Sequence, residues 1–125
     1  MAIYYVRKSG DDGNSGLSPA QAKLTLNAVE DLPITAGDIV YIGAGTYREL
    51  LSGDVSGTAL LPISYIGDYS GEFTGDAGVV RITGSNDDIA YTRDNAIAGT
   101  GKSYRVFNNL KFDLSRYQLV NPQTN

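Results

Sequence analysis

The chain of 125 residues contains no cysteine, no histidine and no tryptophan. Without cysteine it has no disulfides, no thiolate zinc site and no redox motif. Without histidine it has no catalytic unit of the Ser-His-Asp or Cys-His kind and no imidazole metal ligand. The stability of the fold must therefore come from packing and hydrogen bonds alone.

Long apolar runs are also absent from the sequence. No run approaches the roughly 20 residues of a membrane span. The short apolar start, 3–6, precedes its basic pair Arg7-Lys8, whereas in a signal peptide the basic residues come first. The net charge of −4 lacks the basic surplus of nucleic-acid binders. We therefore expect neither a membrane nor a nucleic acid as partner.

The sequence does contain 15 glycines and 9 tyrosines, with short apolar runs cut by polar turn residues. This texture is typical of an all-β chain, and the length predicts one domain over 1–125. Five apolar segments predict strands: 3–6, 39–42, 62–68, 79–85 and 104–112. The last of these strands is expected to bend at Asn108-Asn109.

One helix start is legible. Ser18 is a candidate N-cap, with proline at the next position and Gln21 three residues on, as in a capping box. The spacing predicts a helix over 18–31 that covers a core with one face. Leu24 and Val29 are expected to lie on the buried side of that helix.

Short strands that end in Gly or Asn recur along the chain at irregular spacing. Repeats of this size predict a solenoid with one coil per repeat. A small antiparallel sandwich fits the same turn signals, and sequence periodicity does not separate the two.

Several motifs combine Gly, Asp and Asn turns with short strands: 5–6, 10–19, 26–29, 36–42, 45–49 and 62–67. Together they resemble the opening of right-handed parallel β-helix proteins of the pectate-lyase-like superfamily. The resemblance implies an all-β fold, a short right-handed parallel β-helix in which the helix 18–31 caps the N-terminal end. It also allows the chain to be the N-terminal part of a longer β-helix. It implies no single activity, since that family includes polysaccharide lyases, glycosidases, bacterial surface proteins and phage tailspikes.

Two motifs suggest ligands but have plainer interpretations. Residues 96–103 match a loose phosphate-loop pattern, yet a strand rather than a helix is expected to follow, so we predict no nucleotide binding. Residues 11–16 resemble the start of an EF-hand loop, but Ala22 stands where the twelfth-position Glu is needed. We therefore expect a turn there, and no metal or other cofactor.

Glycosidases need two carboxylates about 5 to 9.5 Å apart. Nothing in the sequence selects such a pair among the acidic candidates, which are Asp54, Asp68, Glu72, Asp76 and Asp87. Arg81, on a predicted strand, is a candidate base of the kind that the resemblance to lyases implies, but no acidic cluster is apparent beside it. No catalytic residue is therefore predicted, and the question of enzyme activity stays open.

Tyrosine rings are amphipathic and stack on sugars or at protein interfaces. We interpret Tyr41 and Tyr65 as strand packing. The tyrosines in loops or at strand ends are better candidates for contact with a glycan or a partner: Tyr69, Tyr91 and Tyr117.

Charge is unevenly distributed, because residues 93–125 carry five of the ten basic side chains and two of the fourteen acidic ones. Such a basic region can dock on an acidic partner, although it is more often a solvated face. The C-terminal end also has no legible cap for its strand edges. The predicted contact residues there are Arg105, Lys111 and Arg116, with the apolar Phe112 and Leu119.

These observations predict that the C-terminal end binds other copies of the chain or a larger virion protein. The resemblance to phage β-helix spikes implies a trimer for the first case. A β-helix opening without a secretion signal favours a non-enzymatic structural or adhesive component of a tailed-phage virion, assembled in the host cytoplasm. A decoration protein, a head fibre or a tailspike part would fit, with a cell-surface glycan as a further partner. The alternatives are a fragment of a secreted polysaccharide lyase or glycosidase, or a bacterial surface module that binds glycans.

Overall fold

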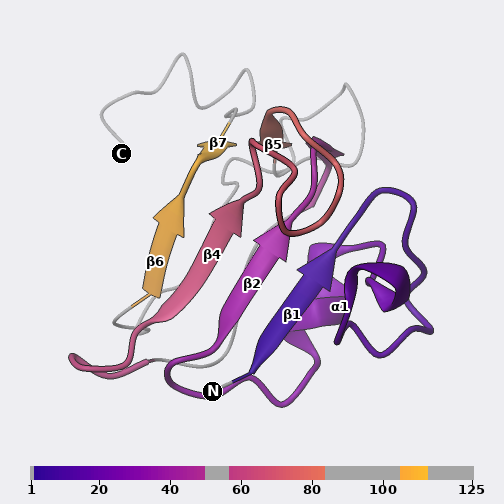
Figure 1. Ribbon diagram of the computed structural model, residues 1–125. Helices are drawn as coiled ribbons and strands as arrows, with labels where there is room; N and C mark the ends of the chain where they lie inside the picture. The colour runs from indigo at the N-terminus through magenta and orange to yellow at the C-terminus, as the bar shows by residue number, and fades with distance from the viewer. Residues whose placement is uncertain (1, 50–56, 84–104, 113–125) are drawn as a thin grey trace.

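The computed structural model describes residues 2–49, 57–83 and 105–112, whose strands form two parallel sheets (Figure 1). The first sheet has the order β1 (Ile3–Val6), β2 (Ile39–Ile42), β4 (Ile63–Gly67) and β6 (Arg105–Asn108). The second has the order β3 (Gly45–Tyr47), β5 (Val80–Ile82) and β7 (Leu110–Phe112). From β2 onward, consecutive strands alternate between the two sheets.

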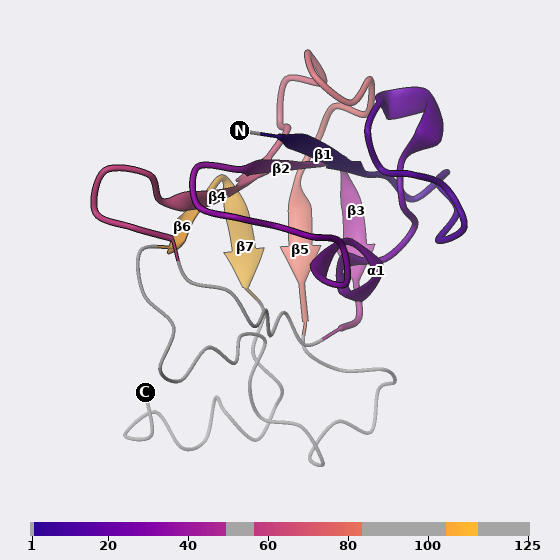
Figure 2. The same cartoon turned by 90° about the horizontal axis from the view of Figure 1, so that it is seen from below.

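Side-chain alternation along the strands separates a core face from an outer face. In β1 and β2, Tyr4, Val6 and Val40 are buried, while Tyr5 and Tyr41 are half-buried on the opposite face. Figure 2 shows the second sheet and the helix α1 (Leu26–Glu30) on the same side of the first sheet. The core therefore lies between the two sheets and this helix, and its buried members are Tyr4, Val6, Leu26, Val29, Ile34, Val40, Ile42, Tyr47, Ile63, Tyr65, Val80 and Ile82.

The helix predicted over 18–31 is wrong in its extent. The structure has a 3-10 turn, η1 (Pro19–Gln21), and then the short α1. The predicted N-cap is confirmed, because the Ser18 hydroxyl accepts a hydrogen bond from the Gln21 N–H at 3.2 Å. Lys23, between the two helical pieces, instead forms a parallel bridge with Val6 of β1.

An aspartate explains why the helix starts late. The Asp12 carboxylate accepts hydrogen bonds from the N–H groups of Leu24 at 3.0 Å and Thr25 at 2.9 Å, so those groups are not used in a helix. Thr25 then caps α1. Val29 is buried as predicted, but Leu24 lies before the helix and is only half-buried. The buried leucine of this segment is Leu26.

The predicted fold class, an all-β right-handed parallel β-helix with a capping helix, is also wrong. The described residues form two parallel sheets with short helical segments, a small α/β-like domain. The segment between β1 and β2 forms turns, η1, a single bridge and α1, and it adds no strand to the second sheet. The segment 7–38 thus lacks the strand pattern that follows it, whereas a solenoid repeats one unit along its length. The antiparallel sandwich is excluded because each described strand pair is parallel.

The predicted strands agree with the structure better than the predicted helix does. Those over 3–6 and 39–42 are confirmed, and those over 62–68 and 79–85 match the shorter β4 and β5. The predicted bend is confirmed at Asn109, whose φ of 57° separates β6 from β7. The strand β3 is missed, because none of the five predicted strands covers 45–47. No helix in the described part of the chain is long and apolar enough to cross a membrane.

Candidate functional site

Three aromatic side chains form a row on the outer face of the first sheet. The strand register pairs Tyr5 of β1 with Tyr41 of β2, and their ring centroids lie 6.0 Å apart. Phe73, from the loop between β4 and β5, stacks on Tyr41 with centroids 4.1 Å apart and an interplanar angle of 6°. We call Tyr5, Tyr41 and Phe73 the aromatic strip.

A shallow cleft of about 340 Å³ lies at the carboxyl end of β4, beside this strip. Its walls combine aromatic, apolar and polar groups, which come from Ile66, Gly67, Asp68, Tyr69, Ser70, Phe73 and Asn109. Tyr69 is 66% exposed and Phe73 is 43% exposed, so both rings are available to a ligand. We call this feature the β4 cleft.

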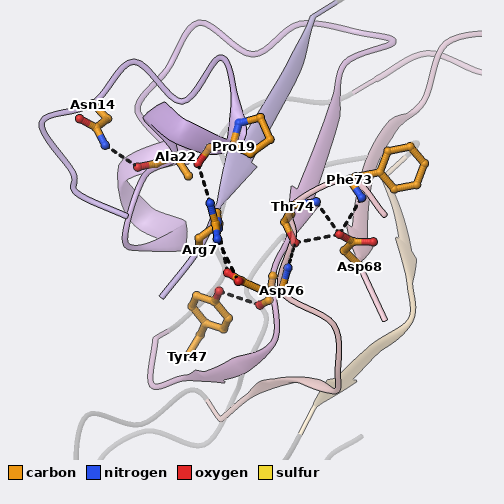
Figure 3. A network of polar contacts seen from close by, with 10 residues as sticks. Arg7, Asn14, Pro19, Ala22, Tyr47, Asp68, Phe73, Thr74 and Asp76 are labelled. Carbon is orange, nitrogen blue, oxygen red and sulfur yellow. Dashed lines mark hydrogen bonds and ion pairs between the residues drawn. The ribbon is translucent and has the colours of Figure 1, made fainter. Parts of the chain in front are cut away.

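A buried aspartate shapes the loop that carries these rings. The Asp68 Oδ2 atom accepts hydrogen bonds from the Phe73 N–H at 3.0 Å and from the Thr74 N–H at 2.6 Å. The Thr74 hydroxyl donates a third bond to the same atom at 2.8 Å. Figure 3 shows these contacts, with the Phe73 ring turned away from the carboxylate. Asp68 thereby fixes the loop backbone from which Phe73 projects.

An ion pair ties the same loop to Arg7, the residue that follows β1. The Arg7 guanidinium donates to both carboxylate oxygens of Asp76, at 2.8 and 3.0 Å (Figure 3). Arg7 also donates to the Pro19 carbonyl at 3.1 Å. The hydrogen bonds from Arg7 hold the pKa of Asp76 below its ordinary value, against the smaller opposing effect of burial. Asp68 thus fixes the loop at Phe73 and Thr74, and Arg7 fixes it at Asp76, so the loop backbone that carries Phe73 is restrained.

The remaining wall of the cleft comes from the corner between β6 and β7. A side chain at Gly67 would bring its Cβ to 2.1 Å from the Asn109 carbonyl oxygen. Glycine at this position therefore permits the close approach of the two chain segments. That approach brings Asn109 into the lining of the cleft, together with residues of the β4–β5 loop.

The residues predicted to contact a glycan or a partner are dispersed. Tyr69 lines the cleft and is exposed, so its predicted role stays open to test. Lys111 is exposed on β7 and stands in register with Arg81 of β5. Phe112 ends β7. The other predicted residues lie outside the described part of the chain, and they are Tyr91, Arg116, Tyr117 and Leu119.

Arg105 differs most from its predicted place near a partner contact. Its side chain is 5% exposed and faces the equally buried Glu30 at 3.9 Å. Both groups meet the Tyr65 hydroxyl, which donates to Glu30 at 2.5 Å and accepts from Arg105 at 3.3 Å. Burial is the main cause that raises the pKa of Tyr65, so the hydroxyl keeps its proton. Arg105 therefore acts inside the domain and offers little surface to a partner.

Two of the five acidic candidates for catalysis make structural contacts, and Glu72 is exposed on the β4–β5 loop. Asp68 and Asp76 hold the β4–β5 loop, while Asp54 and Asp87 lie outside the described residues.

In the predicted turn over 11–16, Asp11 accepts the Gly13 N–H at 2.7 Å, in agreement with a turn. No group of three or more metal-ligating side chains occurs within 2–49, 57–83 and 105–112. The predicted phosphate-like loop, 96–103, lies outside the described residues.

Sequence reasoning missed the aromatic strip. It interpreted Tyr41 as strand packing and did not single out Tyr5 or Phe73. The alternation of side chains along a strand could have indicated part of it. Tyr5 and Tyr41 are each the third residue of their strand, so they lie on the same face of the sheet. The contact with Phe73 could not be found this way, since it depends on the path of the loop.

Neither a protein-family model nor a curated protein matches the chain. Among solved structures it is similar to XylC in complex with xylose, with 25% identity and a TM-score of 0.50 over 64% of this chain and 12% of that one. It is also similar to the GH136 lacto-N-biosidase from Eubacterium ramulus, with 30% identity and a TM-score of 0.53 over 66% of this chain and 13% of that one. The same enzyme solved as its selenomethionine derivative gives the same values. The chain thus spans about an eighth of the length of these proteins.

Proposed function

We propose that this chain is a carbohydrate-binding module that holds a saccharide in the β4 cleft. The observation that carries the proposal is the exposure of two aromatic rings, Tyr69 and Phe73, beside the polar groups of Asp68, Ser70 and Asn109.

The chemistry of sugars suits such a cleft. A pyranose ring has apolar C–H faces and a rim of hydroxyl groups, so it is recognised by aromatic surface together with a few placed polar atoms. In the β4 cleft the rings of Tyr69 and Phe73 can supply the apolar contact. The Ser70 hydroxyl and the Asn109 amide can exchange hydrogen bonds with the rim.

The similar solved structures support the same class of ligand. One was solved with xylose and the other is a lacto-N-biosidase, so both are proteins of carbohydrate chemistry. Fold likeness does not determine function by itself. It adds to the proposal because the cleft supplies an independent reason to consider a sugar.

Binding is proposed rather than hydrolysis, because Asp68 and Asp76 have structural duties, and the exposed Glu72 does not by itself make a catalytic pair. Asp68 accepts three hydrogen bonds from its own loop, and Asp76 is paired with Arg7. A glycosidase needs one carboxyl as an acid and a second as a nucleophile or base.

The virion role expected from the sequence stays a prediction. A carbohydrate-binding module suits a virion protein that contacts a cell-surface glycan, and it suits a secreted glycan-active protein equally well. Neighbouring capsid or tail genes would favour the first of these settings.

Titration calorimetry with xylose oligomers and with lacto-N-biose tests the proposal. We expect saturable binding that Tyr69→Ala or Phe73→Ala weakens by about tenfold or more, as for an anchoring aromatic residue. The matched control is Leu60→Ala, since Leu60 is 91% exposed and lies before the opposite end of β4. Failure of both sugars to bind, or binding that neither aromatic substitution weakens, would contradict the proposal.

A further inference from the structure

We propose that the β4 cleft selects uncharged saccharides and rejects glycans that carry uronate or sulfate groups. This inference rests on the proposed carbohydrate binding and specifies its ligand class.

The charge at the cleft is acidic. Asp68 is its one charged member among the described lining residues, which include no lysine or arginine. Glu72 is exposed on the same loop, between Ser70 and Phe73 of the cleft. A ligand between Tyr69 and Phe73 would therefore lie close to two carboxylates.

The pKa of Tyr41, in the aromatic strip, is affected by these charges. Burial is the largest cause that raises the pKa of the Tyr41 hydroxyl. Electrostatic interactions with Tyr5, then with Asp68 and Glu72, raise this pKa further. Because the Tyr41 ring stacks on Phe73, both carboxylates act at the surface where a sugar would pack.

No lysine or arginine is among the described residues that line the cleft. Arg7 is paired with Asp76, and Lys8 lies over the Tyr47 ring, 4.5 Å from its centroid. Arg81 and Lys111 stand side by side on the second sheet. These four cations are not among the described lining residues, so the acidic character of the cleft remains.

A carboxylate or sulfate on a ligand would meet this field as a like charge. Each close pair of like charges near a protein surface costs on the order of a fewfold to tenfold in affinity. Salt reduces that cost, because the Debye length is about 10 Å at 0.1 M ionic strength. An uncharged sugar carries no such penalty and its binding should vary little with salt.

The experiment compares neutral xylose oligomers with galacturonate oligomers of equal length, by calorimetry at low and high salt. We expect the uronate to bind at least fivefold more weakly at low salt, with a smaller difference at high salt. Glu72→Lys should strengthen uronate binding severalfold and leave the neutral sugar unchanged. The charge-matched control is Asp31→Lys, at the C-terminal end of α1, which should leave both affinities unchanged.

The outcomes separate the two proposals. Equal or tighter binding of the uronate at low salt would overturn the charge selection and leave the carbohydrate site standing. Discrimination that Asp31→Lys removes as well as Glu72→Lys would also overturn it, because the effect would then come from net charge alone. Failure of both oligomers, and of lacto-N-biose, to bind would overturn the carbohydrate site and this inference with it.

Discussion

Several acidic side chains in the described part of the chain hold its backbone. Asp12 and Asp68 each bind two successive N–H groups, and Glu49 binds those of Leu26 and Asn27 at the start of α1. Hydrogen bonds to an ionised acceptor are about twice as strong as neutral ones. A chain without disulfides therefore uses carboxylates to fasten its irregular segments.

The ion pair between Arg7 and Asp76 predicts a dependence of stability on pH. Arg7 lowers the folded-state pKa of Asp76 below its ordinary 3.8, so the contribution is complete above that value and is lost as pH falls through the folded pKa. Asp76→Asn should reduce the free energy of unfolding at pH 7 by about 1 kcal/mol or less, because the pair is partly exposed.

Urea unfolding of both proteins at several pH values measures this effect. The difference between wild type and Asp76→Asn should shrink below pH 3.8. The control Asp31→Asn, at an exposed position, should stay within about 0.5 kcal/mol of wild type. A difference for Asp76→Asn that persists unchanged into strong acid would argue against the ion pair.

The interior pair of Glu30 and Arg105 makes a sharper prediction. Arg105→Met leaves the Glu30 carboxylate buried without its cation, which should cost about 3–5 kcal/mol. The double variant Glu30→Gln with Arg105→Met should recover part of that loss. Chemical unfolding of the single and double variants measures the coupling. Strictly additive losses would show that the two groups do not interact.

At the level of the elements, the corner between β6 and β7 depends on the space at Gly67. Gly67→Ala would place a methyl group 2.1 Å from the Asn109 carbonyl oxygen, so the corner must move. We expect a loss of about 1–3 kcal/mol in stability, as for an overpacked interior, together with weaker binding at the cleft.

The control for this substitution is Gly13→Ala, whose nearest contact would be at 3.2 Å from the flexible Asp11 carboxylate. Thermal unfolding and sugar titration are measured for both variants. An unchanged melting temperature for Gly67→Ala would mean that the corner does not lie against β4.

The short helix α1 is held by burial more than by its length, since helices this short are marginal alone. Leu26→Ala should cost about 2–5 kcal/mol, because Leu26 is fully buried against the core. Leu24→Ala should cost clearly less, because Leu24 precedes the helix and is half-buried. Equal losses for the two substitutions, measured by urea unfolding, would contradict this packing.

At the scale of the whole molecule, the sequence predicts association. Exposed edges of parallel strands tend to pair with other chains, and the basic and apolar residues near the C-terminus were expected at such a contact. Light scattering should give a mass above that of one chain, and Phe112→Asp or Leu119→Asp should lower it. Leu60→Asp, at an exposed loop position, serves as the control. A monomer at high concentration, unchanged by these substitutions, would remove the case for an obligate partner.

The features that the sequence by itself determined are those that depend on local residue patterns. Runs of β-branched and aromatic residues marked β1 and β2, Ser18 marked its cap, and Asn108-Asn109 marked the corner before β7. Each of these features depends on neighbours within a few residues, so the sequence contains it directly. The exclusion of disulfides and of histidine chemistry likewise needs only the composition.

Only the tertiary structure decided how these pieces combine. The Asp12 contacts that delay α1, the interior place of Arg105 and the stacking of Phe73 on Tyr41 each join residues more than ten positions apart. Such contacts depend on strand register and on the path of loops, which local periodicity does not specify. For the same reason, the sequence does not predict the β4 cleft, although it does single out Tyr69, one of the lining residues, as a contact candidate.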